Sequence, residues 1–390
     1  MSDVEQALTE AFRADWGRVV ATLIGAVGDW DLAEEAVQEA FAAALPAWRR
    51  DGVPDSPRAW LTTTARNRAI DRIRREKAAA GKLRELAVET ASELDVDLDA
   101  LDTGIADDRL RLLYTCCHPA LSLESQVTLA LRTLCGLSTA QVAGIFLVPE
   151  ATMAKRLVRT KRKIAVAGIP YRVPPAHLLP ERTNAVLNAI YLLFQQTYIA
   201  GTGNHARDLA ALVDDLMPDH PEAAGLHALL LLLDARRAAR IEDGALVPLE
   251  DQDRSRWDTA MIDEGMRVLR RALRRERVGP FQLQALIAGC HVQESTDWAR
   301  IAGLYDRLVA LVPSSTVRLN RAIAIAMRDG PEPALLDGIE HPLVPATKAD
   351  FLRRLGRPAE AVPHYREALR RTDNPAEQAY LRRRLAETQQ

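Results

Sequence analysis

The chain has 390 residues, is nearly half apolar (48%) and carries a net charge of only −2 at pH 7. This length suits two or three domains, and few aromatics with many alanines, leucines and arginines favour helices. We expect an all-α protein. The longest apolar run, Leu226 to Leu233, is interrupted by His227 and is too short to cross a bilayer. The polar N-terminus lacks the apolar core of a signal peptide, so we expect a cytoplasmic protein without a membrane partner.

Four cysteines (Cys116, Cys117, Cys135 and Cys290) form no disulfide framework in a chain of this length, which favours a reducing compartment. Cys116 and Cys117 precede His118, but adjacent cysteines chelate poorly and no CxxC or HxxxH partner is present. We expect packed thiols, no metal site and no cofactor.

Residues 5–27 have helical apolar spacing, and Gly28-Asp29 ends that helix. A second helix begins at Asp31 with an apolar face that includes Phe41. Its other face carries Glu34, Glu35, Gln38 and Glu39. Two interpretations stay open for these acids: simple solvation, or a docking surface for a basic partner.

A loop over residues 49–56 precedes a helix that begins at Pro57 and is rich in arginine. Its apolar stripe includes Trp60, which either lies in the core or offers a stacking plane to an unpaired base. Asn67 and Arg68 offer hydrogen bonds to base edges, and the density of arginine suits phosphate contact. The polar residues of this candidate surface are Arg66, Asn67, Arg68, Asp71, Arg72, Arg74 and Arg75.

Residues 85–108 hold nine acidic residues and no lysine or arginine. Aspartate at every second position is unfavourable in a strand, so we predict an extended linker. It is either a solvated spacer or a segment that follows a basic channel.

Residues 107–134 are expected to supply supporting helices for a helix-turn-helix over residues 136–164. Ser138 is placed as the N-cap of its first helix, Pro149 breaks the chain, and Glu150 lies in the first turn of the second helix. Met153, Leu157, Val158 and Ile164 are expected to face inward. A short helix across a longer basic one is the shape that enters a DNA major groove, although an ordinary helical hairpin with a basic face has the same pattern. The side chains expected to contact DNA are Thr152, Lys155, Arg156, Arg159, Lys161 and Lys163.

Three segments, DLAEEAVQEAF, RAWLTTTARNRAIDRIRREK and LSTAQVAGIFLVPEATMAKRLVRTKRKI, resemble in order and spacing the two-domain bacterial RNA polymerase sigma factors of the extracytoplasmic-function (ECF) group. The resemblance covers residues 1–170. It implies sigma region 2 over 1–80, an acidic linker over 81–106 and a region 4 helix-turn-helix over 107–170. It further implies that Asp31 to Phe41 docks on core polymerase, that Trp60 to Arg75 melts and reads the −10 promoter element, and that Arg156 and Arg159 read or grip the −35 element.

Prolines over 171–180 predict a stiff connection to a helical domain over 181–390. Ala361, Tyr365 and Ala368 repeat the spacing of Ile301, Tyr305 and Leu308, and the last unit resembles a tetratricopeptide (TPR) repeat. We expect a degenerate solenoid, which can bind a protein or peptide on its concave surface; the alternative is a compact bundle without a groove. The layout resembles an ECF subgroup with such an extension.

The segment LEDQDRSRWD (249–258) mixes acids, arginines and Trp257, and it is similar to the motif of that subgroup. It is either a functional loop or a local ion-pair network, and we favour the ion pairs.

The leading hypothesis is therefore a promoter-specificity subunit of RNA polymerase, whose C-terminal domain controls activity in cis by contacting the sigma domains. A ligand- or partner-regulated helix-turn-helix regulator that is no polymerase subunit is the alternative. The sequence contains no Gly-rich phosphate loop, nucleophile elbow or HExxH motif, so we do not expect an enzyme.

Overall fold

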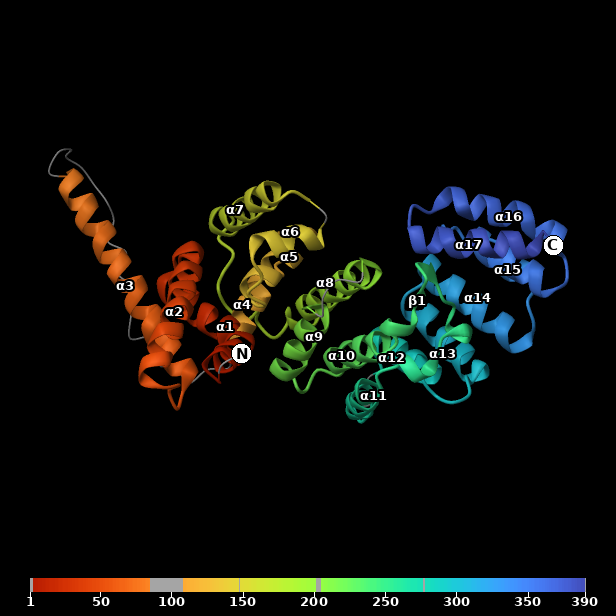
Figure 1. Cartoon of the computed structure of the whole chain (residues 1–390), viewed down its shortest axis with the longest axis horizontal. Coiled ribbons are helices and arrows are strands. Elements are labelled where there is room, and N and C mark those ends of the chain that lie inside the picture. The colour runs from red at the N-terminus through yellow and green to blue at the C-terminus, as the bar shows by residue number, and fades with distance from the viewer. Residues whose placement is uncertain (1–2, 85–107, 147, 201–204, 276–277, 390) are drawn as a thin grey trace. The chain divides into compact units, whose positions relative to one another are not determined.

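The computed structural model describes residues 3–84, 108–146, 148–200, 205–275 and 278–389 (Figure 1). Helices make up most of these residues, and the strands among them are the two-residue β1 (Ile241–Glu242) and β2 (Ala245–Leu246), which pair antiparallel. The predicted all-α class is confirmed. Contacts divide the chain into two compact units, Met1–Leu209 and Ala210–Gln390. Most of the predicted acidic linker lies outside the described residues.

The first unit begins with three helices, α1 (Asp3–Val27), α2 (Trp30–Asp51) and α3 (Pro57–Arg84). Asp29 caps α2, since its carboxylate accepts the N–H groups of Asp31 and Leu32. The helix ends at Gly52, whose φ of 86° is a conformation that favours glycine. The predicted loop over 49–56 is therefore shorter than expected, because Arg49 to Asp51 continue α2. The buried side chains of this bundle include Val19, Leu23, Val37, Ala40, Leu61 and Ala65.

The second block of this unit comprises α4 (Asp108–Cys116), α5 (Leu123–Thr133), α6 (Thr139–Ile145) and α7 (Glu150–Val166). Ser138 caps α6 as predicted and forms a capping box with Gln141: the Ser138 hydroxyl accepts the Gln141 N–H, and the Gln141 side chain accepts the Ser138 N–H. Pro149 is the N-cap residue of α7 and Glu150 lies in its first turn. The predicted helix-turn-helix is confirmed.

Helix α8 (Leu179–Ala200) follows the proline-containing connection and packs on α4. The hydroxyl groups of Tyr114 and Thr183 lie 2.7 Å apart, and the Arg182 guanidinium donates to the Tyr114 carbonyl at 2.6 Å. Because α8 shares this buried contact with α4, the start of the predicted C-terminal domain belongs structurally to the first unit.

Helix α9 (His205–Leu216) spans the boundary between the units, and α10 (Pro221–Asp234), α11 (Thr259–Leu273) and α12 (Pro280–His291) pack together in the second. The apolar run in α10 is a buried core helix. Gly225 allows α12 to approach, because a Cβ there would lie 2.8 Å from the Gln282 nitrogen. Glu222 accepts the N–H groups of Phe281 and Gln282 at 2.8 and 3.0 Å and so caps α12 from a neighbouring helix.

The rest of the second unit adds α13 (Trp298–Leu311), α14 (Ser315–Asp329), α15 (Val344–Arg354), α16 (Pro358–Arg371) and α17 (Pro375–Thr388). Its apolar side chains form successive clusters: one joins α12, α13 and α14, the next joins α14 and α15, and the last joins α15, α16 and α17. Such neighbour-to-neighbour packing is how helical repeats bury their apolar faces. The repeat positions Ile301, Leu308, Ala361, Tyr365 and Ala368 are all buried.

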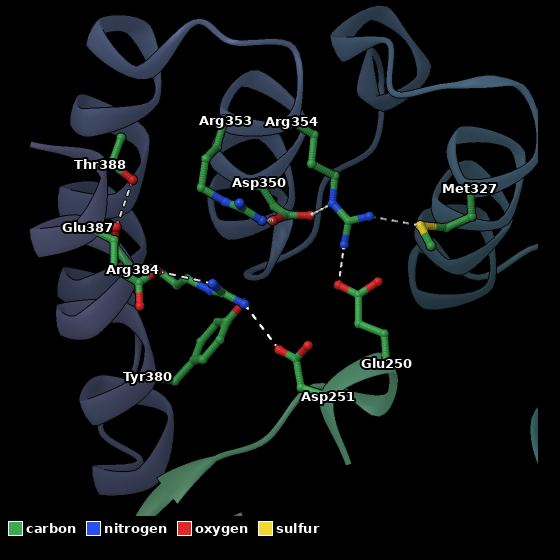
Figure 2. Close-up of polar contacts among 10 residues, drawn as sticks. All are labelled: Glu250, Asp251, Met327, Asp350, Arg353, Arg354, Tyr380, Arg384, Glu387 and Thr388. Carbon is green, nitrogen blue, oxygen red and sulfur yellow. Dashed lines mark hydrogen bonds and ion pairs between the residues drawn. The ribbon is translucent and has the colours of Figure 1, made fainter. Parts of the chain in front are cut away.

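Short 3-10 turns complete the second unit, at Arg237–Ala239, Leu249–Asp251, Arg254–Arg256 and Pro333–Leu336. The segment between α10 and α11 lies against the last helices (Figure 2). Glu250 pairs with Arg354 of α15, and Asp251 lies 3.2 Å from Arg384 of α17. Arg354 also pairs with Asp350. The 249–258 segment therefore forms ion pairs as favoured, but the expectation of a local network was wrong for these pairs, since they join residues more than a hundred positions apart in the chain.

Candidate nucleic-acid interface

The acidic face of α2 lies along one side of the first bundle. The side chains of Asp31, Glu35 and Glu39 are 78%, 49% and 46% exposed, whereas that of Glu34 is only 6% exposed. Gln38 is exposed, and Phe41 is buried against the rings of Phe12 and Trp16. The six residues expected to dock on polymerase thus divide into an exposed row and two side chains that the fold covers.

The arginines of α3 meet this acidic face. Arg72 lies 2.6 Å from Glu35 and 3.3 Å from Glu76, and Arg68 lies 3.9 Å from Glu39. Hydrogen bonds to Glu35 and then to Glu76 raise the pKa of the Arg72 guanidinium. A hollow of about 350 Å³ is lined by Ala36, Glu39, Arg68, Arg72, Arg75 and Glu76. The hollow is a mixed-charge site: Glu39 comes from α2, whereas Glu76 and the three arginines come from α3.

The remaining α3 candidates are distributed around the helix. Asn67, Asp71, Arg74 and Arg75 are exposed, and Arg66 is half-buried. Trp60 is also half-buried, and its ring lies edge-on to the fully buried Trp48 with centroids 5.8 Å apart. Trp60 therefore packs on the core without being fully buried, an arrangement between the two interpretations of the sequence.

Helix α7 turns most of its cations outward. Thr152, Lys155, Arg159 and Lys163 are exposed, as is Arg162. The buried face consists of Met153, Leu157, Thr160 and Ile164. The inward placement of Val158 was wrong, since it is 63% exposed: spacings of three and four residues carry the buried row from Leu157 to Thr160, and Val158 lies a further 100° around the helix.

Two other cations of α7 are already engaged. The Arg156 guanidinium pairs with Glu124 of α5 and lies 5.7 Å from the centroid of the Phe146 ring. Lys161 points away from the outward face, and its Nζ lies 2.7 Å from Asp31 and 3.2 Å from Glu34 of α2. Lys161 is thus the residue through which a candidate DNA-binding helix and the candidate polymerase-docking helix meet.

Arg132 of α5 completes this meeting point, because its Nε lies 3.2 Å from Glu34. Arg132 was not predicted from the sequence. A positive charge near a helix C-terminus is common and favourable, so its position does not indicate a role. Nothing in the spacing of the sequence places it beside Glu34, a residue almost a hundred positions earlier. Only packing of α5 on α1 brings the two together.

Three of the four cysteines are buried, and Cys116 lies close enough to Glu34 and Lys161 for their charges to act on its thiol. Cys116 and Cys117 are buried, and burial raises the pKa of the Cys117 thiol to about 12. Within the described residues, His, Cys, Asp and Glu form no cluster of three or more able to hold a metal ion. Nor does that part of the chain contain a helix whose length and apolarity would let it span a membrane.

Comparison with known proteins adds two family matches: residues 12–79 match sigma-70 region 2, and residues 182–273 match a family of unknown function, DUF6596. An uncharacterized protein of Rhizobium meliloti (strain 1021) is 42% identical over 91% of this chain and 89% of its own length. The ECF RNA polymerase sigma factor SigK of Mycobacterium ulcerans is 31% identical over 36% of this chain and 74% of its own.

A probable ECF RNA polymerase sigma factor, SigI of Mycobacterium tuberculosis (strain CDC 1551 / Oshkosh), is 28% identical over 43% of this chain. The match spans 58% of that relative's length. No solved structure matches.

Proposed function

The chain belongs to the ECF RNA polymerase sigma factors, and we propose that α2, α3 and α7 divide the work of that family among them. As members of a family of non-enzymatic initiation factors, sigma factors act in transcription initiation with core RNA polymerase and promoter DNA. In this proposal α2 docks on core polymerase, α3 melts and reads the −10 element, and α7 reads the −35 element. The site of action is the cytoplasm.

One observation carries the assignment of the −35 element to α7. The helix follows a capped α6 and a proline break, and it presents Thr152, Lys155, Arg159 and Lys163 on one exposed face. Cations on the outward face of the second helix of such a motif are placed to reach base edges and phosphates in a major groove.

The assignment of the −10 element to α3 rests on a different arrangement. Arg68, Arg72 and Arg75 line the hollow, Asn67 and Arg74 are exposed, and the half-buried Trp60 lies earlier on the same helix. Unpaired bases are held by stacking and by cations that follow the backbone, at about 1–3 kcal/mol for each stacked base. The accessible part of the Trp60 ring is the stacking plane we propose.

Two measurements test the proposal together. The full chain is mixed with core polymerase, and co-purification is followed by run-off transcription from promoters recovered by selection with the reconstituted enzyme. We expect both association and promoter-dependent transcripts. Specific binding of DNA by the chain alone, without association with core polymerase, would instead favour an ordinary helix-turn-helix regulator.

The second unit is proposed to control the sigma domains in cis. Its size, its repeat packing and the Glu250–Arg354 and Asp251–Arg384 pairs, which tie the 249–258 segment to the last helices, support a structured regulatory domain. Deletion should remove 210–390 rather than begin at residue 181, because α8 packs on Tyr114 in the first unit. A rise in transcription would indicate masking and a fall would indicate support; unchanged transcription would refute control in cis.

A protein or peptide partner on the repeat surface is proposed for a hollow of about 740 Å³ beside α15 and α16. Apolar Val344 and Pro345 line it together with the charged Lys348, Glu367 and Arg371. Such mixed lining suits a peptide with both apolar and charged side chains. Retention of peptides from a displayed library by the wild-type chain, and their loss with Lys348→Glu, would support this partner.

A further inference from the structure

The acids of α2 face cations from both candidate DNA-binding helices. Glu35 and Glu39 face Arg72 and Arg68 of α3, while Asp31 and Glu34 face Lys161 of α7. We infer that the Asp31–Glu34 end of α2 is a shared docking surface: in the free chain the second helical block, residues 108–166, occupies it, and core polymerase competes with that block for it. The inference rests on the proposed docking role of α2.

The low exposure of the paired side chains shows that this contact is part of the folded structure. The side chains of Glu34, Arg132 and Lys161 are 6%, 13% and 12% exposed. Charges so far removed from water are stable only while they are paired. Glu34 is paired twice, by Arg132 of α5 and by Lys161 of α7, and both partners come from the second block.

The two blocks also approach each other closely at a second set of contacts. A Cβ at Gly17 of α1 would lie 2.7 Å from the Leu134 carbonyl oxygen, and a Cβ at Gly136 would lie 2.8 Å from the Trp16 ring. The Trp16 indole N–H donates to the Thr133 carbonyl at 3.1 Å. Glycine at 17 and 136 therefore lets the two blocks approach until backbone and aromatic ring touch, which a loose or incidental contact does not require.

Phe41 belongs to the same contact. It packs on Phe12 and Trp16 with ring centroids 5.2 and 5.8 Å away, and those two rings touch the Gly136 turn of the second block. Two of the proposed polymerase-contacting side chains, Glu34 and Phe41, thus lie under or beside the second block. Polymerase can reach them only after the block moves away.

The closed arrangement also removes one cation from the proposed DNA surface. Lys161 is held by Asp31 and Glu34, whereas Lys155, Arg159 and Lys163 stay exposed. Docking of α2 on a basic surface of polymerase would replace Lys161 as the partner of Asp31 and Glu34.

Two variants open the contact without altering a proposed docking or DNA-binding residue. Arg132→Ala removes one partner of Glu34, and Gly17→Ala places a methyl group against the Leu134 carbonyl. Gly144→Ala is the matched control, since a Cβ there meets nothing within 4 Å. Gly144 lies in α6 of the second block, so the control makes the same chemical change within a helix.

Opening is measured in the full-length chain by energy transfer between dyes on Ala42→Cys of α2 and Val166→Cys of α7, both exposed positions. Affinity for core polymerase is measured on the same variants without dyes. We expect lower transfer and about tenfold tighter binding for Arg132→Ala and Gly17→Ala, because apparent affinity scales with the open fraction. Gly144→Ala should match the wild type in both.

The possible results of the two measurements separate the closed contact from the competition with polymerase. Unchanged transfer in both opening variants would show that the contact does not hold the blocks together, and lower transfer with unchanged polymerase affinity would refute competition. If neither the wild type nor any variant bound polymerase, the proposed function would be refuted. The energy-transfer measurement would still test whether the two blocks are in contact. Circular dichroism identifies a misfolded variant, and the second opening variant then carries the test.

Discussion

Replacing Arg159 of α7 by alanine removes an exposed guanidinium from the middle of the proposed −35 face. In the free chain its Nε donates only weakly, at 3.4 Å, to the Lys155 carbonyl of its own helix. Little is therefore lost within the protein when Arg159 turns to DNA. A bidentate arginine–guanine contact discriminates by about 1–3 kcal/mol, which is roughly 5- to 150-fold in affinity.

Arg156, three residues earlier, provides the comparison. Its guanidinium must leave Glu124 and the Phe146 ring before it can contact a base. Giving up a half-exposed ion pair and a cation–π contact costs about 1 kcal/mol together. The loss of affinity for matched −35 DNA should therefore be about fivefold smaller for Arg156→Ala than for Arg159→Ala. Glu124→Gln should raise the affinity for the same DNA.

The assay reconstitutes the full chain with core polymerase and measures competition between promoter DNA with a matched and with a scrambled −35 element. Arg159→Ala should lose affinity for the matched DNA and little for the scrambled DNA. Polymerase affinity should stay nearly unchanged for both arginine variants. Equal losses on both DNAs would refute base reading, and a larger loss for Arg156→Ala than for Arg159→Ala would refute the argument from Glu124 and Phe146.

Three further predictions use other parts of the structure. Exchange of thymine for uracil in the −35 element should weaken wild-type binding about threefold to fourfold and leave Val158→Ala unaffected, because Val158 is exposed on the side of α7 that it shares with Lys155 and Arg162, three and four residues away, and a buried methyl contributes about 0.8 kcal/mol; equal losses in both would contradict this contact. Ser138→Ala should lower the free energy of unfolding by about 1 kcal/mol in a denaturant titration, since it removes half of a capping box, and no change would mean that α6 is held by packing alone. Burial raises the pKa of Glu222 above its ordinary value, so its contribution to stability is greatest below that value and falls as pH rises through the raised pKa. Wild-type stability relative to Glu222→Gln should thus be higher at pH 4 than at pH 7, and the opposite order would refute the sign.

The sequence by itself determined the local structure of this protein. Ser138 and Gln141 cap α6, Pro149 precedes α7 and Asp29 caps α2, because capping and proline geometry act over a few residues. The helix-turn-helix and the all-α class followed from such local rules. Helical spacing also placed Met153, Leu157 and Ile164 in the core, because each element has one apolar face to bury.

Helical spacing did not correctly place side chains near the boundary between the buried and the exposed face of a helix. Val158 was assigned inward from its apolar character, yet Thr160 takes the buried place because its position on the helix, not its polarity, decides. Lys161 looked like one more cation of a basic helix. Its actual partners, Asp31 and Glu34, lie about 130 residues away, and no local pattern specifies them.

Only the tertiary structure decided which charges meet. Packing of α5 on α1 turns Arg132 toward Glu34, and the 249–258 segment finds Arg354 and Arg384 on helices that come much later in the chain. A charged side chain on a helix face can contact water, a neighbouring helix or a partner molecule. Its position in the sequence determines the face on which it lies but not what packs against that face. Long-range ion pairs therefore follow from how the helices pack, and it is their packing that joins the proposed polymerase-docking and DNA-binding residues in one contact.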